Sequence, residues 1–391
     1  MNKKIYADHA ATTPLEREVL EAMLPFLGEN YYNPSALYPE ARAVRAMIEE
    51  ARSALLDVIG GDPEGSIVFT GSGTESVNMA LRSAVSTLMK SSAEIPLKRN
   101  KPFPGRILVS AVEHHAVLNC ASSLESEGFA VQCLPVDRYG VVSPDTLKEY
   151  MGPDVLLVSV MSVNNETGAV NDTAALSKIA HAGGAKFHTD AVQALGVFPI
   201  HAKEMGADYI SFSAHKIYGP KGVGALYAAP GAPVSPLVFG GKQEGGVRAG
   251  TENTGGIAGF GCAAGILRKR LEEDFFHLAG LKQVFLEGIA NISGLIVNSP
   301  PNGAPHIINI SAAGVEAEPC LLHLSMAGVL ASMGAACNAS SVEPSHVVEA
   351  IGVPPEHKRG TLRFSFGREN TKEDAERAAE NLVLVLAKLR K

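Results

Sequence analysis

The sequence predicts an α/β fold in which a large, mostly parallel sheet is joined to a smaller α+β unit. The first observation is length, because 391 residues are more than one ordinary hydrophobic core holds, so two domains are expected. The second is a regular alternation of short apolar runs with helical stretches from about residue 15 to residue 260. The third is a change of pattern after that point, where a long helical stretch leads into a segment with few strands.

The large domain is expected to contain a seven-stranded sheet, because seven short apolar runs are bounded by turn residues. The strands are expected at residues 67–70, 106–110, 130–134, 155–161, 186–189, 209–213 and 224–228. Helices are expected at residues 16–26, 40–59, 74–90, 115–127, 144–150 and 173–181. Such an alternation indicates a mostly parallel sheet with helices on both faces.

The second domain begins after a connector. Residues 255–269 are rich in small residues, and the helical pattern continues to about residue 292. Strands are expected at residues 307–311 and 361–366, and a final helix at residues 372–389. We therefore expect residues 15–260 to form the large domain, and residues 1–14 together with 261–391 to form the small one.

Composition and charge argue against several classes of protein. The net charge is −7, and the 34 basic residues form no long run, which argues against nucleic acid or an anionic membrane as the main partner. The first residues form no apolar signal region, and no stretch reaches the roughly 18 apolar residues of a membrane span. The five cysteines are scattered and form no Cys-x-x-Cys pair. We expect a reduced, cytoplasmic protein with free thiols and no zinc site.

A lysine stands where an apolar strand ends in a loop. Residues 209–213 alternate like a strand, and residues 217–222 contain the glycine and proline of a turn, so Lys216 lies at the strand end beside His215. A lysine in such a place can acquire a lowered pKa and become a nucleophilic amine that forms a Schiff base. The alternative is an ordinary solvated lysine, and this segment alone does not separate the two.

A glycine-rich turn at residues 70–76, Thr-Gly-Ser-Gly-Thr-Glu-Ser, joins a strand to a helix. Its backbone N–H groups at the helix N-terminus, with the hydroxyls of Ser72 and Thr74, suit a phosphate. It is neither a Walker P-loop nor a GxGxxG fingerprint, since no Gly-Lys-Ser/Thr follows and Ser76 replaces the third glycine. An ordinary helix cap that includes Thr74 is the alternative.

Two further strand ends carry groups suited to a flat cofactor ring. Asp190 follows the strand at 186–189, at the sheet edge where α/β proteins bind ligands, and its carboxylate can hold a proton on a ring nitrogen. His114 follows the strand at 106–110, where an imidazole can stack on the ring. A helix N-cap aspartate and a helix-start histidine are the alternatives. A metal site is disfavoured, because neither His-x-His nor HExxH spacing occurs.

Two residues of the second domain carry chemistry of their own. Cys337 lies among small residues at 333–341, so its thiol is accessible and can react as a thiolate, with a buried loop thiol as the alternative. Arg363 lies inside an alternating strand, where an unpaired arginine is costly to bury. A substrate carboxylate bound bidentately would satisfy the guanidinium, and a structural ion pair is the alternative.

Taken together, a phosphate loop, a ring-stacking histidine, a ring-nitrogen aspartate and a Schiff-base lysine, in this chain order, describe a pyridoxal phosphate site. The chain resembles the cysteine desulfurases of the NifS/IscS type, within the class V aminotransferase family of fold-type I pyridoxal phosphate enzymes, over nearly its whole length. The motifs that carry the resemblance are Ala-Ala-Thr-Thr-Pro at 10–14, Asn-Pro-Ser at 33–35, Gly-Thr-Glu-Ser at 73–76, Glu-His at 113–114, Val-Asn-Asn-Glu-Thr-Gly at 163–168, His-Thr-Asp-Ala-Val-Gln at 188–193, Ser-Phe-Ser-Ala-His-Lys at 211–216, Arg-Ala-Gly-Thr at 248–251 and Leu-Arg-Phe-Ser at 362–365.

The resemblance implies a role for each matching residue, with pyridoxal 5'-phosphate as the cofactor. Lys216 would form the internal aldimine, Asp190 would pair with the pyridinium nitrogen, Gln193 would bond the ring hydroxyl and His114 would stack on the ring. The residues that would hold the phosphate are Gly73, Thr74, Ser213 and His215. Thr251 matches a residue that reaches the phosphate of the neighbouring subunit, so a homodimer is implied. Asn165 and Arg363 would bind the substrate carboxylate.

The implied reaction converts L-cysteine to L-alanine and passes the sulfur, as a persulfide on Cys337, to an iron–sulfur scaffold or a thiolation carrier. Lys216 would take the Cα proton while the ring held by Asp190 stores the charge. Because only a few per cent of a free thiol is ionised near pH 7, the site must raise that fraction or supply a base, and His114 is the nearest candidate. The alternatives are a selenocysteine lyase, another class V lyase or aminotransferase, and a non-catalytic thiol carrier on a degenerate scaffold.

The chain departs from the family pattern at residues 240–246. Gly-Gly-Lys-Gln-Glu-Gly-Gly stands here in place of Gly-Gly-Gly-Gln-Glu-Arg-Gly, so one glycine and the arginine are lost. We expect this change to bear on substrate preference or partner more than on the cofactor.

Overall fold

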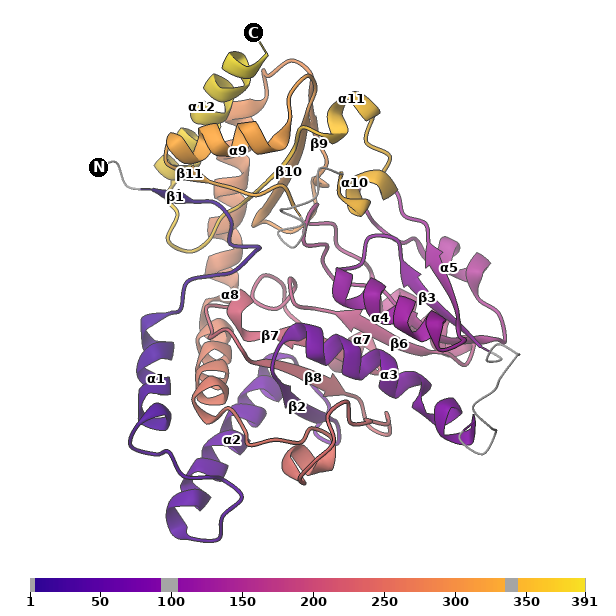
Figure 1. Ribbon diagram of the computed structural model, residues 1–391. Helices are drawn as coiled ribbons and strands as arrows, with labels where there is room; N and C mark the ends of the chain where they lie inside the picture. The colour runs from indigo at the N-terminus through magenta and orange to yellow at the C-terminus, as the bar shows by residue number, and fades with distance from the viewer. Residues whose placement is uncertain (1–3, 93–104, 335–343, 391) are drawn as a thin grey trace.

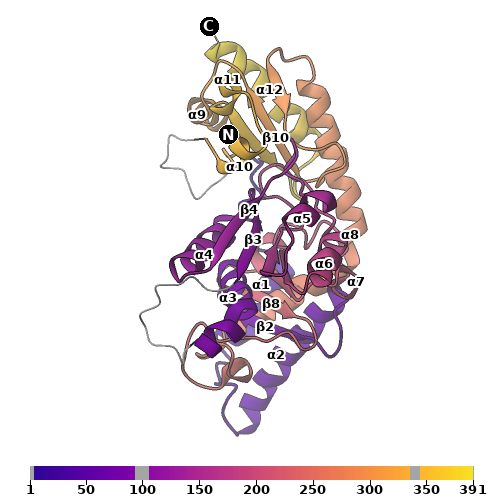
Figure 2. The same cartoon turned by 90° about the vertical axis from the view of Figure 1, so that its right-hand side faces the viewer.

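The computed structural model of the chain describes residues 4–92, 105–334 and 344–390. A large α/β unit and a small α+β unit are joined by the long helix α8 (Thr254–Ile289) (Figure 1). In the side view the molecule is elongated, and the first and last described elements, β1 (Ile5–Tyr6) and α12 (Lys372–Leu389), both belong to the small unit (Figure 2). Within the described ranges, no helix is both long and apolar enough to cross a membrane.

The large unit is built on a sheet of seven strands in the described part of the chain, in the order β2-β8-β7-β6-β5-β3-β4. Only β8 runs antiparallel to its neighbours, so the sheet is mostly parallel, which confirms the prediction. The strands are β2 (Ser66–Thr70), β3 (Arg106–Ser110), β4 (Ala130–Leu134), β5 (Val155–Ser159), β6 (Lys186–Asp190), β7 (Tyr209–Ser213) and β8 (Gly224–Ala228).

Helices cover both faces of this sheet, because successive strand residues point to opposite sides. On one face Ile107 and Val109 pack under α3 and α4. On the other face Leu108 and Phe187 pack against α2, α5, α6 and the first part of α8. The helices of this unit are α1 (Arg17–Leu27), α2 (Pro39–Val58), α3 (Gly73–Ser92), α4 (His115–Ser126), α5 (Pro144–Tyr150), α6 (Thr173–Ala182) and α7 (Ala202–Met205).

The helix α8 links the hydrophobic cores of the two units. Its residues up to Leu271 pack with the large core, and those from Leu278 onward pack with the small one. The domain boundary expected after residue 260 therefore falls inside a continuous helix, about three turns before the last residue that packs with the large core. The small residues at the start of α8 allow α2 to pack closely against it, since a side chain at Gly261 would come within 2.6 Å of Cβ of Ala51 in α2.

The small unit contains a three-stranded antiparallel sheet in the order β12-β10-β9 and a parallel pair of β1 with β11. Its last helix starts at a capping box, in which Thr371 and Asp374 bond each other's backbone N–H groups. The sequence did not predict β1, β9, β11, α7, α9, α10 or α11, most of which are too short for a periodic signal. The elements are β1 (Ile5–Tyr6), β9 (Leu295–Val297), β10 (Ile307–Ala312), α9 (Ala317–Met326), β11 (Val329–Leu330), α10 (His346–Ala350), α11 (Pro355–Lys358), β12 (Thr361–Ser365) and α12 (Lys372–Leu389).

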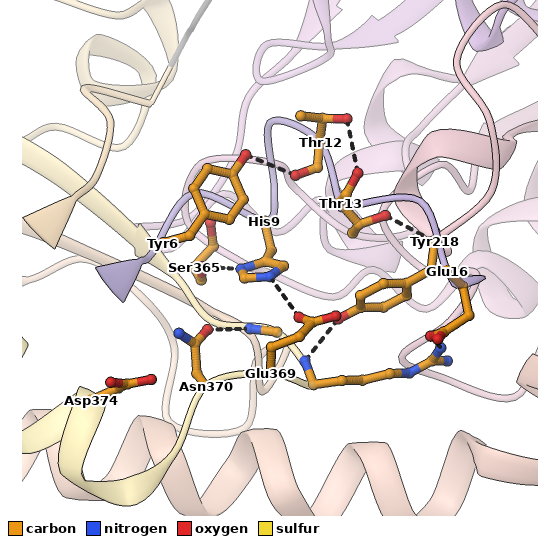
Figure 3. Close-up of polar contacts among 12 residues, drawn as sticks. Tyr6, His9, Thr12, Thr13, Glu16, Tyr218, Ser365, Glu369, Asn370 and Asp374 are labelled. Atoms are coloured by element: carbon orange, nitrogen blue, oxygen red, sulfur yellow. Dashed lines mark hydrogen bonds and ion pairs between the residues drawn. The ribbon is translucent and has the colours of Figure 1, made fainter. Parts of the chain in front are cut away.

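A polar cluster ties the N-terminal segment to both units (Figure 3). The hydroxyl of Tyr218, in the large unit, accepts a hydrogen bond from the backbone N–H of Arg368, in the small unit, at 2.8 Å. The guanidinium of Arg368 lies 4.2 Å from the centre of the Tyr218 ring. His9 lies 3.2 Å from the Glu369 carboxylate through Nε2. These contacts hold the two units together, and one of the contacting residues, Tyr218, lies two residues after Lys216 in the sequence.

Candidate active site

A cavity of about 260 Å³ lies at the carboxyl edge of the parallel strands, where the large unit meets the small one. Because parallel strands end at the same edge, loops that are far apart in the sequence converge there. The small unit contributes Gly334, His346 and Arg363 to its wall. The expected site residues that line the cavity are Gly73, Thr74, His114, Asn165, Asp190, Gln193, Ser213, His215, Lys216 and Arg363.

The turn after β2 forms a cradle at the N-terminus of α3. Ser72 caps this helix, since its Oγ accepts a hydrogen bond from the backbone N–H three residues later at 3.1 Å. Gly73 is buried, and a side chain there would come within 3.0 Å of Val192 and 3.3 Å of Ser213. The glycine therefore keeps bare backbone against the cavity, beside the hydroxyl-bearing Ser213. Backbone N–H groups at a helix start in such a cradle suit a phosphate.

The N-terminal segment holds Lys216. Its Nζ donates to the carbonyl oxygens of Ala10 at 2.5 Å and Ala11 at 2.8 Å. The neighbouring His215 places Nδ1 3.1 Å from Oγ1 of Thr12. Residues 10–12 of the Ala-Ala-Thr-Thr-Pro motif thus position the lysine and the histidine together. Burial, with the charge of Lys216 and of a second lysine, lowers the pKa of His215 to about 4.

Asp190 ends β6 with 6% of its surface exposed, and Oδ1 accepts a hydrogen bond from the backbone N–H of Val192 at 2.9 Å. Burial raises its pKa to about 6, although this bond and the charge of Lys216 act in the opposite direction. A carboxylate under this desolvation cost gains from a cationic N–H partner, and a protonated ring nitrogen is such a partner.

His114 is the N-cap residue of α4, and its Nδ1 accepts a hydrogen bond from the backbone N–H of Ala116 at 3.1 Å. The proton of the neutral ring is therefore on Nε2. Burial, with the charges of Lys216 and His115, lowers the pKa of His114 to about 4. A neutral imidazole whose lone pair is already engaged is a poor base. This arrangement argues against the expectation that His114 activates a thiol, and it leaves the ring face and the Nε2–H for other roles.

Gln193 is held from two sides. Its Nε2 donates to the carbonyl oxygen of Ala10 at 2.8 Å, and its Oε1 lies 3.3 Å from Nε2 of His306. His306 precedes β10 in the small unit and is 6% exposed. The carboxamide is thus oriented by groups from the N-terminal segment and from the small unit.

Arg363 lies in β12 and is 2% exposed. Its Nη2 donates to Oδ1 of Asp8 at 2.8 Å, and its Nη1 donates to the carbonyl oxygens of Asn165 at 2.8 Å and Gly334 at 2.7 Å. The structural ion pair that we considered is therefore present, with Asp8 as its acid. These bonds do not use all the N–H groups of a guanidinium, and Nε has no partner among the described residues. Arg363 keeps donor capacity for an anionic ligand.

Glu166 is a buried carboxyl group beside this arginine. Its Oε1 accepts a hydrogen bond from Oγ of Ser345 at 2.8 Å, whereas Oε2 has no partner in the part of the chain that the structure describes. A side chain at Gly334 would lie 2.6 Å from Oε2. Gly334 and Ser345 flank the segment that contains Cys337. Burial raises the pKa of Glu166 to about 7, against the Ser345 bond and the charge of Arg363.

Cys337 lies outside the described residues. The other four cysteines are free thiols, and none of them lines the cavity. Burial raises the pKa of Cys120 and Cys320 to about 11 and also raises that of Cys133 and Cys262. Among the described residues, no group of three or more His, Cys, Asp or Glu side chains is placed to bind a metal ion.

Thr251 and the altered segment at 240–246 lie away from the cavity. Thr251 is exposed and is not part of the cavity wall of its own chain. The side chain of Glu244 is 4% exposed, pairs with Arg52 at 2.8 Å and accepts the backbone N–H of Phe69 at 3.0 Å. Phe69 belongs to the edge strand β2, so Glu244 anchors this segment to the sheet and covers an otherwise unpaired N–H.

Sequence reasoning missed three residues of the site: Glu166 lines the cavity, and Asp8 and His306 contact the lining residues Arg363 and Gln193. Asp8 lies two residues before the Ala-Ala-Thr-Thr-Pro motif begins, and Glu166 lies inside the Val-Asn-Asn-Glu-Thr-Gly motif, so their position near these motifs was the available signal. His306 lies in no motif. Only its place just before a predicted strand, after a Pro/Gly-rich loop, could have drawn attention to it.

The residues present fit pyridoxal phosphate. A cradle that a Cβ at Gly73 would fill suits the phosphate, and the buried carboxyl of Asp190 suits a protonated ring nitrogen. The amine of Lys216 lies in the same cavity. The Nε of Arg363, which has no partner among the described residues, supplies a buried donor for the carboxylate of an amino acid.

Comparisons with known proteins agree with this geometry. The profile of the aminotransferase class-V family matches residues 5–378. The chain is 44% identical to the cysteine desulfurase IscS of Dictyoglomus turgidum, over all of this chain and 96% of the relative. It is 42% identical to the cysteine desulfurase IscS of Methanosarcina thermophila, over all of this chain and 93% of the relative.

Solved structures show the same fold. A NifS-like protein superposes with a TM-score of 0.88 at 32% identity, covering 98% of this chain and all of its own. The structure of SspA in complex with cysteine superposes with a TM-score of 0.79 at 34% identity, covering 94% of this chain and all of its own. The chain therefore belongs to the aminotransferase class-V family and, within it, to the cysteine desulfurases, which depend on pyridoxal 5'-phosphate.

Proposed function

We propose that this enzyme converts L-cysteine to L-alanine and carries the removed sulfur as a persulfide on Cys337. The observation that carries the proposal is the meeting of the Lys216 amine, the buried Asp190 carboxyl and Arg363 in one cavity. One N–H of Arg363 has no partner in the part of the chain that the structure describes. The first two groups suit the cofactor and the third suits the carboxylate of an amino acid. Relatives named cysteine desulfurase, at 44% and 42% identity over the whole chain, support L-cysteine as that amino acid.

The cofactor would be held at both ends. Gly73, Thr74, Ser213 and His215 would hold its phosphate, Asp190 its ring nitrogen and Gln193 its ring oxygen, with His114 stacked on the ring. When bound, the group supplies an electron sink that stabilises negative charge at the Cα of the substrate. Asp190 strengthens that sink, because its carboxylate favours the protonated form of the ring nitrogen.

The substrate carboxylate would lie against Arg363 and the side chain of Asn165. Arg363 is already fixed by Asp8 and by two backbone carbonyls, so it loses little conformational freedom when it binds an anion. The structurally similar SspA was solved in complex with cysteine, which supports an amino acid ligand for this fold. The amine of Lys216 would then take the proton from Cα of the substrate as a general base.

The thiolate of Cys337 would attack Sγ of the substrate. The Sγ–Cβ bond breaks, a sulfur–sulfur bond forms on Cys337, and the three-carbon remainder takes up a proton at Cβ and leaves as L-alanine. The balance is one thiol and one cysteine giving one persulfide and one alanine. The pKa of each of the four described thiols is raised, which lowers the fraction present as thiolate. These four cysteines are therefore poor nucleophiles, which supports the assignment of the attack to Cys337.

Partners and location belong to the same proposal. The persulfide would pass to an acceptor protein, either an iron–sulfur scaffold or a thiolation carrier, in the cytoplasm. A homodimer is supported by α1, where Leu20, Leu24 and Leu27 follow helical spacing and are 42%, 54% and 62% exposed. The exposed Thr251 is free to contact a second subunit.

The test is to add L-cysteine to the purified enzyme and to measure alanine together with persulfide on Cys337. Cys337→Ala should lose both products and keep the visible absorbance of the bound cofactor. Cys133→Ala, at an exposed thiol away from the cavity, is the matched control and should keep full activity. Full activity of Cys337→Ala would refute the sulfur assignment.

Two rival functions are separated by the same preparation. A turnover of L-selenocysteine much faster than that of L-cysteine would favour a selenocysteine lyase. A visible absorbance band that borohydride abolishes requires a Schiff base with Lys216. A protein that lacks such a band would be a thiol carrier rather than an enzyme of this type.

A further inference from the structure

We propose that His306 is a positioning residue, which holds the carboxamide of Gln193 so that it presents an N–H, and not its carbonyl oxygen, to the ring oxygen of the bound cofactor. This inference rests on the proposed function, since it requires pyridoxal phosphate in the cavity. It gives a role to a residue of the small unit that lies in none of the site motifs.

The orientation of Gln193 follows from its two hydrogen bonds. The carbonyl oxygen of Ala10 can only accept, so the nitrogen end of the carboxamide must face it, at 2.8 Å. The oxygen end then faces His306, whose Nε2 must be the donor, at 3.3 Å. The Ala10 bond selects this orientation, and the His306 bond fixes the oxygen end of the carboxamide at a second point.

The second N–H of the carboxamide is left for a ligand. A primary amide nitrogen carries two hydrogens, and one of them goes to Ala10. Gln193 lines the cavity, so this orientation offers the cavity a donor. A rotated carboxamide would set oxygen against the Ala10 carbonyl, and it would keep a bond to His306 only if the ring proton moved from Nε2 to Nδ1. The rotation would therefore lose the Ala10 bond and offer the ligand an acceptor instead.

The protonation state of His306 allows its Nε2–H to donate to Gln193. Burial lowers its pKa to about 3, and four nearby basic groups act in the same direction: Lys282, His9, Arg363 and Lys216. The ring is therefore neutral at physiological pH and carries one N–H, which the Gln193 bond assigns to Nε2. Its Nδ1 has no partner among the described residues, so the Gln193 bond is the contact that places the proton on Nε2.

The hold on Gln193 connects parts of the fold that are distant in sequence. Gln193 follows β6 in the large unit, His306 precedes β10 in the small unit, and Ala10 belongs to the N-terminal segment (Figure 1). The backbone carbonyl of His306 also accepts the N–H of Phe366, just after β12, at 3.1 Å, which fixes its place in the small unit. The donor at the cofactor therefore depends on the docking of the two units.

Loss of this hold should be visible in the spectrum of the bound cofactor. An N–H donated to the ring oxygen stabilises the negative charge on that oxygen. The proton that the ring oxygen shares with the Schiff-base nitrogen of Lys216 is then held less tightly, so the pKa of that proton is lower. Without His306 the carboxamide can rotate, and that proton is held more tightly. We expect the pH midpoint of the visible band to rise by about 0.5 to 1 unit, the effect of one ordinary hydrogen bond.

The experiment compares three substitutions of His306 in the cofactor-loaded enzyme. His306→Leu removes the donor, and His306→Asn keeps a polar side chain whose amide is too short to reach Gln193. His306→Gln places an amide N–H near the position of Nε2. The control is Ser299→Ala, because Ser299 is buried and accepts the backbone N–H of Asn309 at 2.8 Å in the same sheet without contacting Gln193. Each variant is titrated spectroscopically, and its cofactor content and thermal unfolding are measured.

We expect the Leu and Asn variants to titrate at higher pH, and the Gln variant and Ser299→Ala to titrate with the wild type. Loss of cofactor from the Leu and Asn variants alone would also support the proposal. It is overturned if these two variants stay loaded and titrate like the wild type, or if all three His306 variants lose the cofactor. In a Gln193→Leu background, His306→Leu should cause no further shift of the pH midpoint. A shift as large as in the wild-type background would also overturn the proposal. A wild-type enzyme without a visible band would contradict the proposed function instead.

Discussion

Replacing Glu166 by glutamine should make the protein more stable at neutral and alkaline pH but not at acid pH. The carboxyl is 1% exposed, its Oε1 has one hydrogen bond, and its Oε2 has no partner among the described residues. Glutamine has nearly the same shape and can keep the bond from Ser345 through its carbonyl oxygen. The substitution therefore removes the ability to ionise with little change in packing.

The expected size follows from the pKa. Burial raises the pKa of Glu166 from 4.5 to about 7. At about 1.4 kcal/mol per pH unit this corresponds to roughly 3 kcal/mol. Because the folded form holds the proton more tightly than the unfolded form, the wild type loses this stability as the pH rises from about 4.5 to about 7. The advantage of Glu166→Gln should therefore grow through that window and stay constant above it.

The assay is denaturant unfolding of the cofactor-free protein from about pH 5 to about pH 8, followed by circular dichroism. The difference between variant and wild type is the quantity of interest, since the buried Glu113 and Asp190 are common to both proteins and cancel. Glu380→Gln, on the exposed face of α12, is the matched control and should show no such trend. A difference that stays the same at every pH would refute the reasoning, because it would mean that Glu166 titrates alike in both states.

Three further predictions concern neighbouring groups. Tyr218→Phe should lower the free energy of unfolding by about 1–3 kcal/mol in denaturant titrations, because the backbone N–H of Arg368 loses its acceptor while the ring contact stays; an unchanged midpoint would contradict this. Asp190→Asn should weaken cofactor binding about tenfold to a hundredfold in reconstitution titrations, by loss of a charge-assisted bond. Since burial raises the pKa of Asp190 to about 6, wild-type affinity should increase as the pH rises through that value, and the Asn variant should lack this contribution. Arg363→Lys should raise KM for L-cysteine about tenfold or more in steady-state kinetics, because an ammonium cannot replace the planar fork that also binds Asp8; an unchanged KM would remove Arg363 from the substrate site.

Much of the large unit could be predicted because its signals are local. The strands of a parallel sheet are buried on both faces and read as short apolar runs, and the helices between them have their own spacing. Helix α5 at Pro144–Tyr150 and helix α12 at Lys372–Leu389 were predicted with their observed bounds. The two-residue strands β1 and β11 were missed, because their pairing depends on a partner more than 300 residues away.

The candidate site could be predicted in part for the same reason. Lys216 and Asp190 stand at strand ends, and parallel strands end at one edge, so their meeting follows from the topology. The ionisation and orientation of side chains could not be predicted. The lone pair of His114 is engaged by a backbone N–H, and Arg363 is paired with Asp8, which is 355 residues distant in sequence.

The sequence by itself determined the fold class, the family and the cofactor and led to the proposed site residues, because strand ends, glycine turns and motifs are formed by short stretches of chain. Only the tertiary structure decided how those residues are held. The Gln193 carboxamide is oriented by Ala10 and His306, and one oxygen of the buried Glu166 carboxyl has no partner within the described ranges. Such contacts join segments that no local pattern connects, and their effects depend on burial, which arises only when the two units pack together.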